Sequence, residues 1–160
     1  MQFSKELRSE VRLESTWVWV APSDWLEAAQ WAHSQGLVRG EWLTAAHEGD
    51  LKFSLFMCLS NQTGKQKYIF ATQTEIEITS VSSIYLRLEF HERETQQLFG
   101  LRFLNMTNSE PALQIQVEGF PLRRDFSLTP RVELPWPGQV DPEKNAKRRT
   151  PPGVNQEWLT

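Results

Sequence analysis

The prolines lie mainly at the end of the chain, and this placement constrains the fold more than any other sequence feature. Six of the nine prolines in 160 residues follow residue 128. Proline fixes φ and lacks a backbone N–H, so a stretch rich in it supports neither a helix interior nor a central strand. We therefore predict one domain over residues 1–128 and an extended, Pro-rich arm over residues 129–160.

The arm carries large apolar side chains as well as prolines. Trp136 and Trp158 are the largest of them. A free tail gains nothing by exposing such groups, whereas a tail laid along another protein buries them. We expect the arm to wrap a partner subunit, with these two tryptophans as anchors. The alternative is a disordered terminus, because chain ends are often loose.

Before the arm, helical and strand patterns alternate. Residues 17–20 are β-branched and aromatic, which is typical of a strand. Pro22 then opens a helix whose apolar residues recur at helical spacing until Gly36. Three further strands are predicted over residues 53–59, 67–72 and 75–79, the first two joined as a hairpin by the turn at 61–65. Residues 41–47 fit a short helix or a strand.

An apolar stripe over residues 81–99 predicts a second helix, with Ser80 as N-cap and Gly100 as the stop. The order strand, helix, several strands, helix indicates the α+β class. We expect a single domain with helices packed on a mostly antiparallel or mixed sheet.

Composition excludes several classes of function. The net charge of −3 gives no support for a nucleic-acid partner, which usually requires a basic patch. No apolar run is long enough for a membrane span, and the first residues lack the apolar core of a signal peptide. The one cysteine, Cys58, lies in an apolar run, so we expect a buried free thiol in a reducing compartment.

Sequence signatures of catalysis are absent: there is no Gly-rich phosphate loop and no nucleophile elbow. His91 and Glu92 begin like a zinc-protease motif, but the fifth position is Thr95. A small enzyme using His91, Glu92 and Glu94 remains an alternative. Neighbouring helix positions project in different directions, which disfavours convergent ligation of a metal.

Two segments do not look like neutral surface. Residues 91–100, HERETQQLFG, place Glu92, Arg93 and Glu94 on a helix that ends at Phe99 and Gly100. Residues 119–128, GFPLRRDFSL, set two arginines and an aspartate between apolar residues. Charged groups flanked by apolar anchors suit a hydrogen-bonded interface, because arginine offers bidentate donors and aromatics supply buried area.

These segments resemble two linked motifs of the 30 kDa subunit family of respiratory complex I, the NADH–quinone oxidoreductase. The family's E-R-E-x-aromatic-D-[ML]-[FY]-G motif corresponds to residues 92–100, and its G-x-P-L-R-K-D-[FY] motif to residues 119–126. The resemblance covers residues 16–130. The motif residues expected at an interface are Glu92, Arg93, Glu94, Phe99, Gly100, Pro121, Leu122, Arg123, Arg124, Asp125 and Phe126.

The sequence departs from the family pattern at two places. Gln96 and Gln97 replace an aromatic–Asp pair, and residues 105–111 replace a G-H-P-x-L-R-R segment. The same domain recurs in energy-converting [NiFe] hydrogenases and in formate hydrogenlyase-type complexes. The departures therefore leave the electron donor and acceptor open.

The resemblance implies a non-catalytic structural subunit in the hydrophilic arm of an NADH:quinone oxidoreductase. Its partners would be the large subunit of the quinone module, or a hydrogenase-like one, and the small iron–sulfur subunit, with no nucleic acid and only indirect membrane contact. Its place would be the cytoplasmic side of the membrane. Iron–sulfur clusters and the quinone or NiFe site would lie on those partners, because one cysteine cannot supply the usual four thiolates.

Within that reading, we expect Glu92, Arg93 and Glu94 to form an ion-pair network on their helix. Arg123, Arg124 and Asp125 are expected to contact a partner. The alternative is that all these charges pair within the subunit and hold the second motif on the first, since sequence alone does not separate internal from intersubunit pairs. A free-standing protein-binding module is a further alternative.

Overall fold

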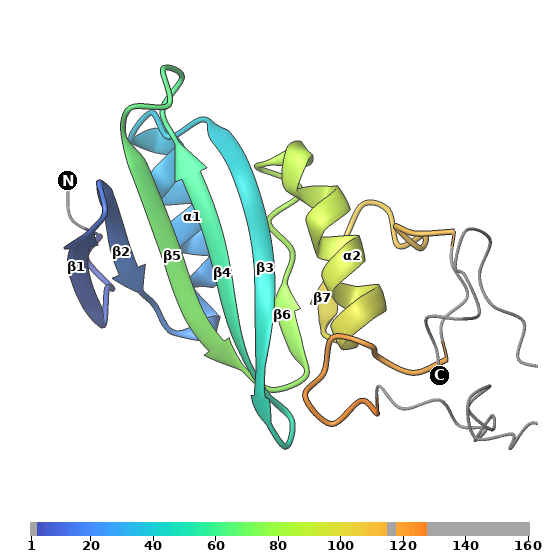
Figure 1. Cartoon of the computed structure of the whole chain (residues 1–160). Coiled ribbons are helices and arrows are strands. Elements are labelled where there is room, and N and C mark those ends of the chain that lie inside the picture. Colours follow the sequence, from blue (N-terminus) through green and yellow to red (C-terminus); the bar gives the residue numbers. More distant parts are fainter. Residues whose placement is uncertain (1–2, 115–117, 128–160) are drawn as a thin grey trace, which may run out of the picture. The chain divides into compact units, whose positions relative to one another are not determined.

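The computed structural model describes residues 3–114 and 118–127. Its helices and 3₁₀ turns are η1 (Pro22–Asp24), α1 (Trp25–Ser34), η2 (Leu86–Leu88) and α2 (Glu89–Phe99). Its strands are β1 (Arg8–Arg12), β2 (Ser15–Trp19), β3 (Arg39–Gly49), β4 (Lys52–Ser60), β5 (Lys67–Thr74), β6 (Glu77–Thr79) and β7 (Arg102–Leu104). The predicted α+β class is confirmed (Figure 1).

Five strands form a mixed sheet in the order β1-β2-β5-β4-β3, and β6 and β7 form a separate two-stranded sheet. Neighbours in the five-stranded sheet are antiparallel except β2 and β5, which run parallel. A parallel pair needs a long crossover, and here α1, β3 and β4 lie within that connection. The predicted hairpin of β4 and β5 is confirmed.

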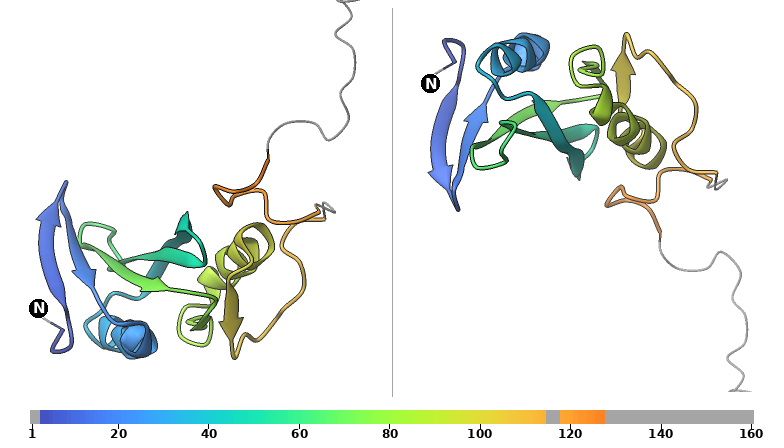
Figure 2. Two further views of the ribbon diagram at one scale, coloured as in Figure 1. Left: turned by 90° about the horizontal axis from the view of Figure 1, so that it is seen from below. Right: turned by 90° about the horizontal axis from the view of Figure 1, so that it is seen from above.

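One face of the sheet builds the core. Side chains alternate along β4, so Phe53, Leu55, Met57 and Leu59 share a face and are almost fully buried. Helix α1 covers this face, with Trp31 packed edge-on against Tyr68 and Phe70 of β5. Both views of Figure 2 show α1 on one side of the sheet. The buried residues of α1 have the helical spacing that the sequence predicts: Trp25, Ala28, Ala29 and Ala32.

The second helix begins later than the sequence predicts. It starts at Glu89 after the 3₁₀ turn η2, so Ser80 is not its N-cap. Residues 81–85 form a turn in which Ile84 and Tyr85 donate backbone N–H bonds to the Val81 carbonyl. The Tyr85 hydroxyl donates to the Leu37 carbonyl at 2.7 Å, and this tertiary bond holds the segment outside a helix. The predicted stop is confirmed, since Gly100 follows α2 with φ of 74°.

Three other segments refine the prediction. The ambiguous residues 41–47 lie within strand β3. The strand predicted over 75–79 is reduced to Glu77–Thr79, which pairs with β7 outside the main sheet. Neither β1 nor β7 was predicted, because β1 is mostly polar and β7 is only three residues long.

The arm lies beyond the described residues, so its path and the roles of Trp136 and Trp158 stay predictions, as does the boundary near residue 128. Among residues 3–114 and 118–127, no helix is long and apolar enough to cross a membrane.

Candidate functional site

The two sequence motifs meet at the C-terminal end of α2. Arg123 Nε donates to the Phe99 carbonyl at 2.6 Å, and the Leu122 backbone N–H donates to the Leu98 carbonyl at 3.2 Å. The last carbonyls of a helix have no intrahelical partner, and a cation is favourable there. The second motif therefore caps the helix that carries the first motif.

Aromatic rings hold the Arg123 side chain in place. Its guanidinium carbon lies 4.2 Å from the Phe120 ring centroid and 5.4 Å from the Phe53 centroid. Contacts of this kind contribute roughly 0.5–2 kcal/mol each, depending on how far water is excluded. Arg123 thus makes contacts inside the chain that hold the second motif on the first, and its contact with a partner stays a prediction.

Gly100 makes the close approach possible. A Cβ at this position would lie 2.6 Å from Arg123 Nη2 and 2.6 Å from Phe120 Cζ. The residue also has φ of 74°, which favours glycine at the end of a helix. Conformation and packing both require glycine here.

The neighbouring charges of the second motif contact the β3–β4 hairpin. The Arg124 backbone N–H donates to Nδ1 of buried His47 at 3.1 Å, while His47 Nε2 lies 2.9 Å from the Asp50 carbonyl. A carbonyl only accepts, so Nε2 carries the proton and the imidazole is neutral. Asp125 Oδ1 lies 3.8 Å from the same Nδ1, and this contact is therefore not an ion pair.

Glu92 of the first motif is fully buried, and it has no cationic partner among residues 3–114 and 118–127. Its Oε1 accepts the Val81 backbone N–H at 2.7 Å, and its Oε2 lies 2.5 Å from the Ser80 hydroxyl. Burial raises the pKa of Glu92 to about 7, although the bonds from Ser80 and Val81 act in the opposite direction. Glu92 thus ties α2 to the chain that leaves β6.

The predicted ion-pair network of Glu92, Arg93 and Glu94 is therefore wrong at Glu92, because hydroxyl and amide donors satisfy that carboxylate. Arg93 pairs with Glu89 at 3.6 Å, one turn earlier on α2. Its guanidinium carbon also lies 6.0 Å from the Phe90 ring centroid. Glu94 is partly exposed.

The remaining motif residues divide by exposure. Phe99 is buried, and Pro121 and Phe126 are partly buried. Leu122, Arg124 and Asp125 are exposed, and their contact with a partner stays a prediction. The chain thus uses Glu92 and Arg123 internally and presents the other charges of the second motif.

One departure from the family pattern, Gln97, bonds to the chain just beyond the other departure, residues 105–111. Gln97 Nε2 donates to the Leu113 carbonyl at 3.0 Å, and the Leu113 N–H donates to Gln97 Oε1 at 2.8 Å. Gln97 therefore fastens the segment that follows residues 105–111. Sequence reasoning missed this role, although two departures at linked motifs were the available signal.

The geometry offers little to catalysis around His91. Glu92 is occupied by Ser80 and Val81, and the His91 ring packs beside Phe90. Within the described part of the chain, no three His, Cys, Asp or Glu side chains are grouped to hold a metal ion. Cys58 is a buried free thiol, as predicted, and burial raises its pKa to about 11.

Comparison with known proteins agrees with the motifs. The family described as respiratory-chain NADH dehydrogenase, 30 kDa subunit, matches residues 18–132. The chain belongs to this 30 kDa subunit family. Both motifs fall inside the matched range, so the helix cap at Arg123 belongs to the family domain.

Curated relatives carry matching names. The chain is 31% identical over 108 residues to NADH-ubiquinone oxidoreductase subunit 9 of Acanthamoeba castellanii, covering 67% of this chain and 53% of that protein. It is 36% identical over 70 residues to an NADH-quinone oxidoreductase subunit from Bartonella bacilliformis, covering 43% of this chain and 34% of that protein. The chain thus spans about half or less of the length of these 30 kDa subunit relatives.

Solved structures share the fold. A chain of the membrane-bound sulfane sulfur reductase, an archaeal respiratory membrane complex, aligns with a TM-score of 0.66 at 17% identity, covering 76% of this chain and 77% of that one. The trypsin-resistant fragment of Nqo5 aligns with a TM-score of 0.53 at 16% identity, covering 63% of this chain and 88% of the fragment. At these identities the likeness shows the fold alone.

Proposed function

We propose that this chain is a non-catalytic subunit of a complex I-type NADH:quinone oxidoreductase. The family match over residues 18–132 carries the proposal, and the relatives named as NADH-quinone oxidoreductase subunits support it. The chain's part is positional: it braces the large subunit of the quinone module and the small iron–sulfur subunit in the hydrophilic arm. Electron transfer there needs cofactors held at fixed spacing.

The composition supports a subunit that carries no redox cofactor of its own. Cys58 is the single cysteine, and it is buried in the sheet with a raised pKa. A cluster normally takes four thiolates. The iron–sulfur clusters and the quinone site would therefore belong to the partners. The subunit would reach the membrane only through them, on the cytoplasmic side.

The motif junction suits this positional role. Arg123 and Gly100 lock the 118–126 segment onto α2, and this locked segment exposes Leu122, Arg124 and Asp125. A segment ordered before binding loses less conformational entropy on association. The exposed part of the second motif is therefore already ordered before a partner binds.

The experiment is a mild-detergent purification through a tag on the full chain, followed by mass spectrometry. We expect a large quinone-module subunit and a small iron–sulfur subunit to co-purify, together with NADH-binding subunits. Recovery of the chain alone as a soluble monomer would contradict the proposal and favour a free-standing protein-binding module.

A second candidate is the equivalent subunit of an energy-converting [NiFe] hydrogenase or a formate hydrogenlyase-type complex. The departures at Gln96, Gln97 and residues 105–111 keep this candidate in play, because they leave the electron donor and acceptor open. Recovery of a hydrogenase-like large subunit without NADH-binding subunits would select this candidate.

A further inference from the structure

The two faces of the five-stranded sheet are covered differently. The core face carries Phe53 and Phe70 and packs against α1, while η2 and α2 pack beside β3, with Leu88 against Gly40. Figure 1 views the sheet with α1 behind it. In residues 3–114 and 118–127, no helix lies over the opposite face of β2, β5 and β4 (Figure 2). We call this second face of the sheet the open face.

Large aromatic side chains line the open face. Strand register places Trp17 and Trp19 of β2, Phe56 of β4 and Trp42 of β3 on it, and all four are partly exposed. The Trp17 ring centroid lies 5.9 Å from that of Trp19 and 6.1 Å from that of Phe56. Aromatic side chains half-covered in this way are typical of interfaces between proteins.

Smaller apolar residues lie between these rings. Cys58 and Ala71 are 4% and 2% exposed, although no helix of the described chain lies above them. The neighbouring aromatic side chains shield them. The centre of the open face is therefore apolar, with half-exposed aromatic rings over small buried residues, and a clustered apolar patch of this kind is typical of an interaction site.

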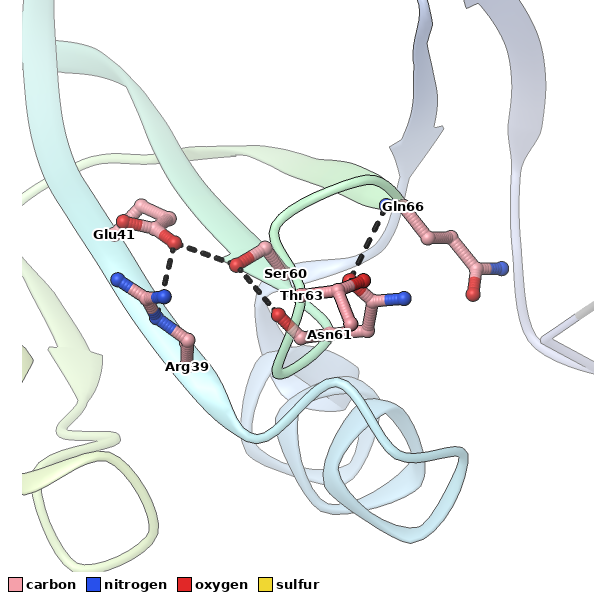
Figure 3. Close-up of polar contacts among 6 residues, drawn as sticks. All are labelled: Arg39, Glu41, Ser60, Asn61, Thr63 and Gln66. Atoms are coloured by element: carbon pink, nitrogen blue, oxygen red, sulfur yellow. Dashed lines mark hydrogen bonds and ion pairs between the residues drawn. The ribbon is translucent and has the colours of Figure 1, made fainter.

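A β-bulge enlarges this face at strand β3. The register shifts between Gly40 and Trp42, so Glu41 and Trp42 both turn toward the open face. Figure 3 shows Glu41 meeting Ser60 at the end of β4, with Arg39 beside it. The Ser60–Glu41 oxygen separation is 2.5 Å, and Arg39 Nε lies 3.4 Å from Glu41 Oε1.

The adjacent turn fixes this end of the face. In Figure 3, Asn61 Oδ1 accepts the Thr63 hydroxyl at 3.1 Å and the Gln66 N–H at 3.3 Å. The bond between the Gln66 backbone N–H and the Asn61 side chain is of the kind that stabilises turns. The Asn61 side chain therefore closes the turn between β4 and β5 at one end of the open face.

Cations exceed carboxylates on this face. Alternation along the strands places five cationic and three acidic side chains on it: Arg8, Arg12, Arg39, Lys52 and Lys67 against Glu10, Glu41 and Glu48. The carboxylates already have partners within the chain. Glu10 pairs with Arg8 and Arg12, and Glu48 accepts the Ser54 hydroxyl at 2.8 Å.

The third carboxylate, Glu41, has partners within the chain as well. The Ser60 hydroxyl lowers the pKa of Glu41, and Arg39, Arg87 and Lys67 lower it further. The chain as a whole has a net charge of −3, so the open face is positive on an acidic molecule. Such a face is complementary to an apolar segment bordered by carboxylates.

We propose that the open face docks a neighbouring oxidoreductase subunit that presents an apolar segment bordered by Asp or Glu side chains. This inference rests on the proposed function, because it takes the occupant from the same assembly. A second copy of this chain is a poorer occupant, since two copies would bring two cation-rich faces together.

Cross-linking gives a direct test in the full-length chain. Thr44 is exposed on the open face, and Gln30 is exposed on α1. Thr44→Cys and Gln30→Cys would each carry a maleimide-linked photo-cross-linker, which spares Cys58 because that thiol is buried. We expect the probe at position 44 to cross-link an oxidoreductase subunit, identified by mass spectrometry, and the probe at 30 to give at least several-fold less product.

A charge reversal tests the chemistry of the occupant. Arg12 and Arg102 are both exposed and each pairs with a glutamate, but Arg102 lies on β7, away from the open face. We expect Arg12→Glu to reduce partner recovery several-fold while Arg102→Glu leaves it unchanged. Equal recovery for the two variants would overturn the carboxylate-bordered occupant.

The outcomes separate this inference from the proposed function. Wild-type purification without oxidoreductase subunits would overturn the proposed function, and this inference with it. Oxidoreductase subunits recovered without a cross-link at position 44 would overturn the inference alone. A cross-linked product of two copies of this chain, or nuclease-sensitive nucleic acid in its place, would also overturn it.

Discussion

At the scale of single residues, the buried carboxylate of Glu92 links stability to pH. Burial raises its pKa from 4.5 to about 7 in the folded chain, so the folded state binds the proton more tightly than the unfolded state. The stabilisation that protonation gives is fully present below pH 4.5 and is lost as pH rises through 7. The free energy of unfolding should fall over this range by at most roughly 3 kcal/mol.

Glu92→Gln tests this link. The amide keeps an acceptor for the Val81 N–H and gains a donor for Ser80, so it removes the charge while retaining the bonds. We expect the variant to unfold with a flatter pH dependence between pH 4.5 and 7, measured by urea denaturation. Glu94→Gln, on the same helix and partly exposed, is the control and should keep the wild-type slope.

Gly100 is the second residue whose substitution should measurably lower the free energy of unfolding. Gly100→Ala must hold an L-residue at φ of 74° and displace Arg123 and Phe120. We expect the free energy of unfolding to fall by about 2–3 kcal/mol, combining backbone strain and overpacking. Gly36→Ala is the matched control, because Gly36 has φ of 85° and open space around it. Equal losses at both positions would show that packing at Gly100 contributes nothing.

At the scale of elements, Gln97 joins α2 to the segment beyond β7. Its amide makes both a donated and an accepted bond with the Leu113 backbone. We expect Gln97→Ala to raise the hydrogen-exchange rate of the Leu113 amide by about tenfold, because local opening loses both bonds. Gln30→Ala, at an exposed position of α1, should leave that rate unchanged. Unaltered exchange in Gln97→Ala would show that other contacts hold the segment.

Local patterns predicted the elements that have strong periodicity. Helix α1 and the β4–β5 hairpin follow directly from their apolar spacing and turn residues. The start of α2 does not follow from its local pattern. Tyr85 bonds to Leu37, a residue distant in sequence, and that tertiary contact overrides the local helix preference. Strand β1 was missed for a related reason, since its polar residues join a sheet only through pairing with β2.

The site was predictable in its residues and less so in its contacts. The two motifs identified Gly100 and Arg123, and the structure brings both to the end of α2. Sequence did not reveal that Glu92 bonds to Ser80, because a hydroxyl twelve positions away gives no charge signal. Partners of a charged residue depend on tertiary packing, which composition and spacing do not encode.

At the scale of the whole molecule, the described core draws on residues that all precede the arm. Within residues 3–114 and 118–127, the hydrophobic core cluster lies between Phe3 and Phe103. We expect deletion of residues 131–160 to leave a domain that melts cooperatively, while recovery of partner subunits falls in the tagged purification. Loss of cooperative melting in the truncated chain would instead show that the arm completes the core.

The parallel pairing of β2 with β5 has a consequence for biosynthesis. Trp17 lies beside Ile69, so the N-terminal hairpin has no place in the sheet until β5 has left the ribosome. During that interval, Trp17 and Trp19 are carried on a nascent chain that has no sheet to join, and such apolar segments are prone to aggregate or to recruit chaperones. The β1–β2 hairpin is therefore synthesised well before the strand that gives it a place in the sheet.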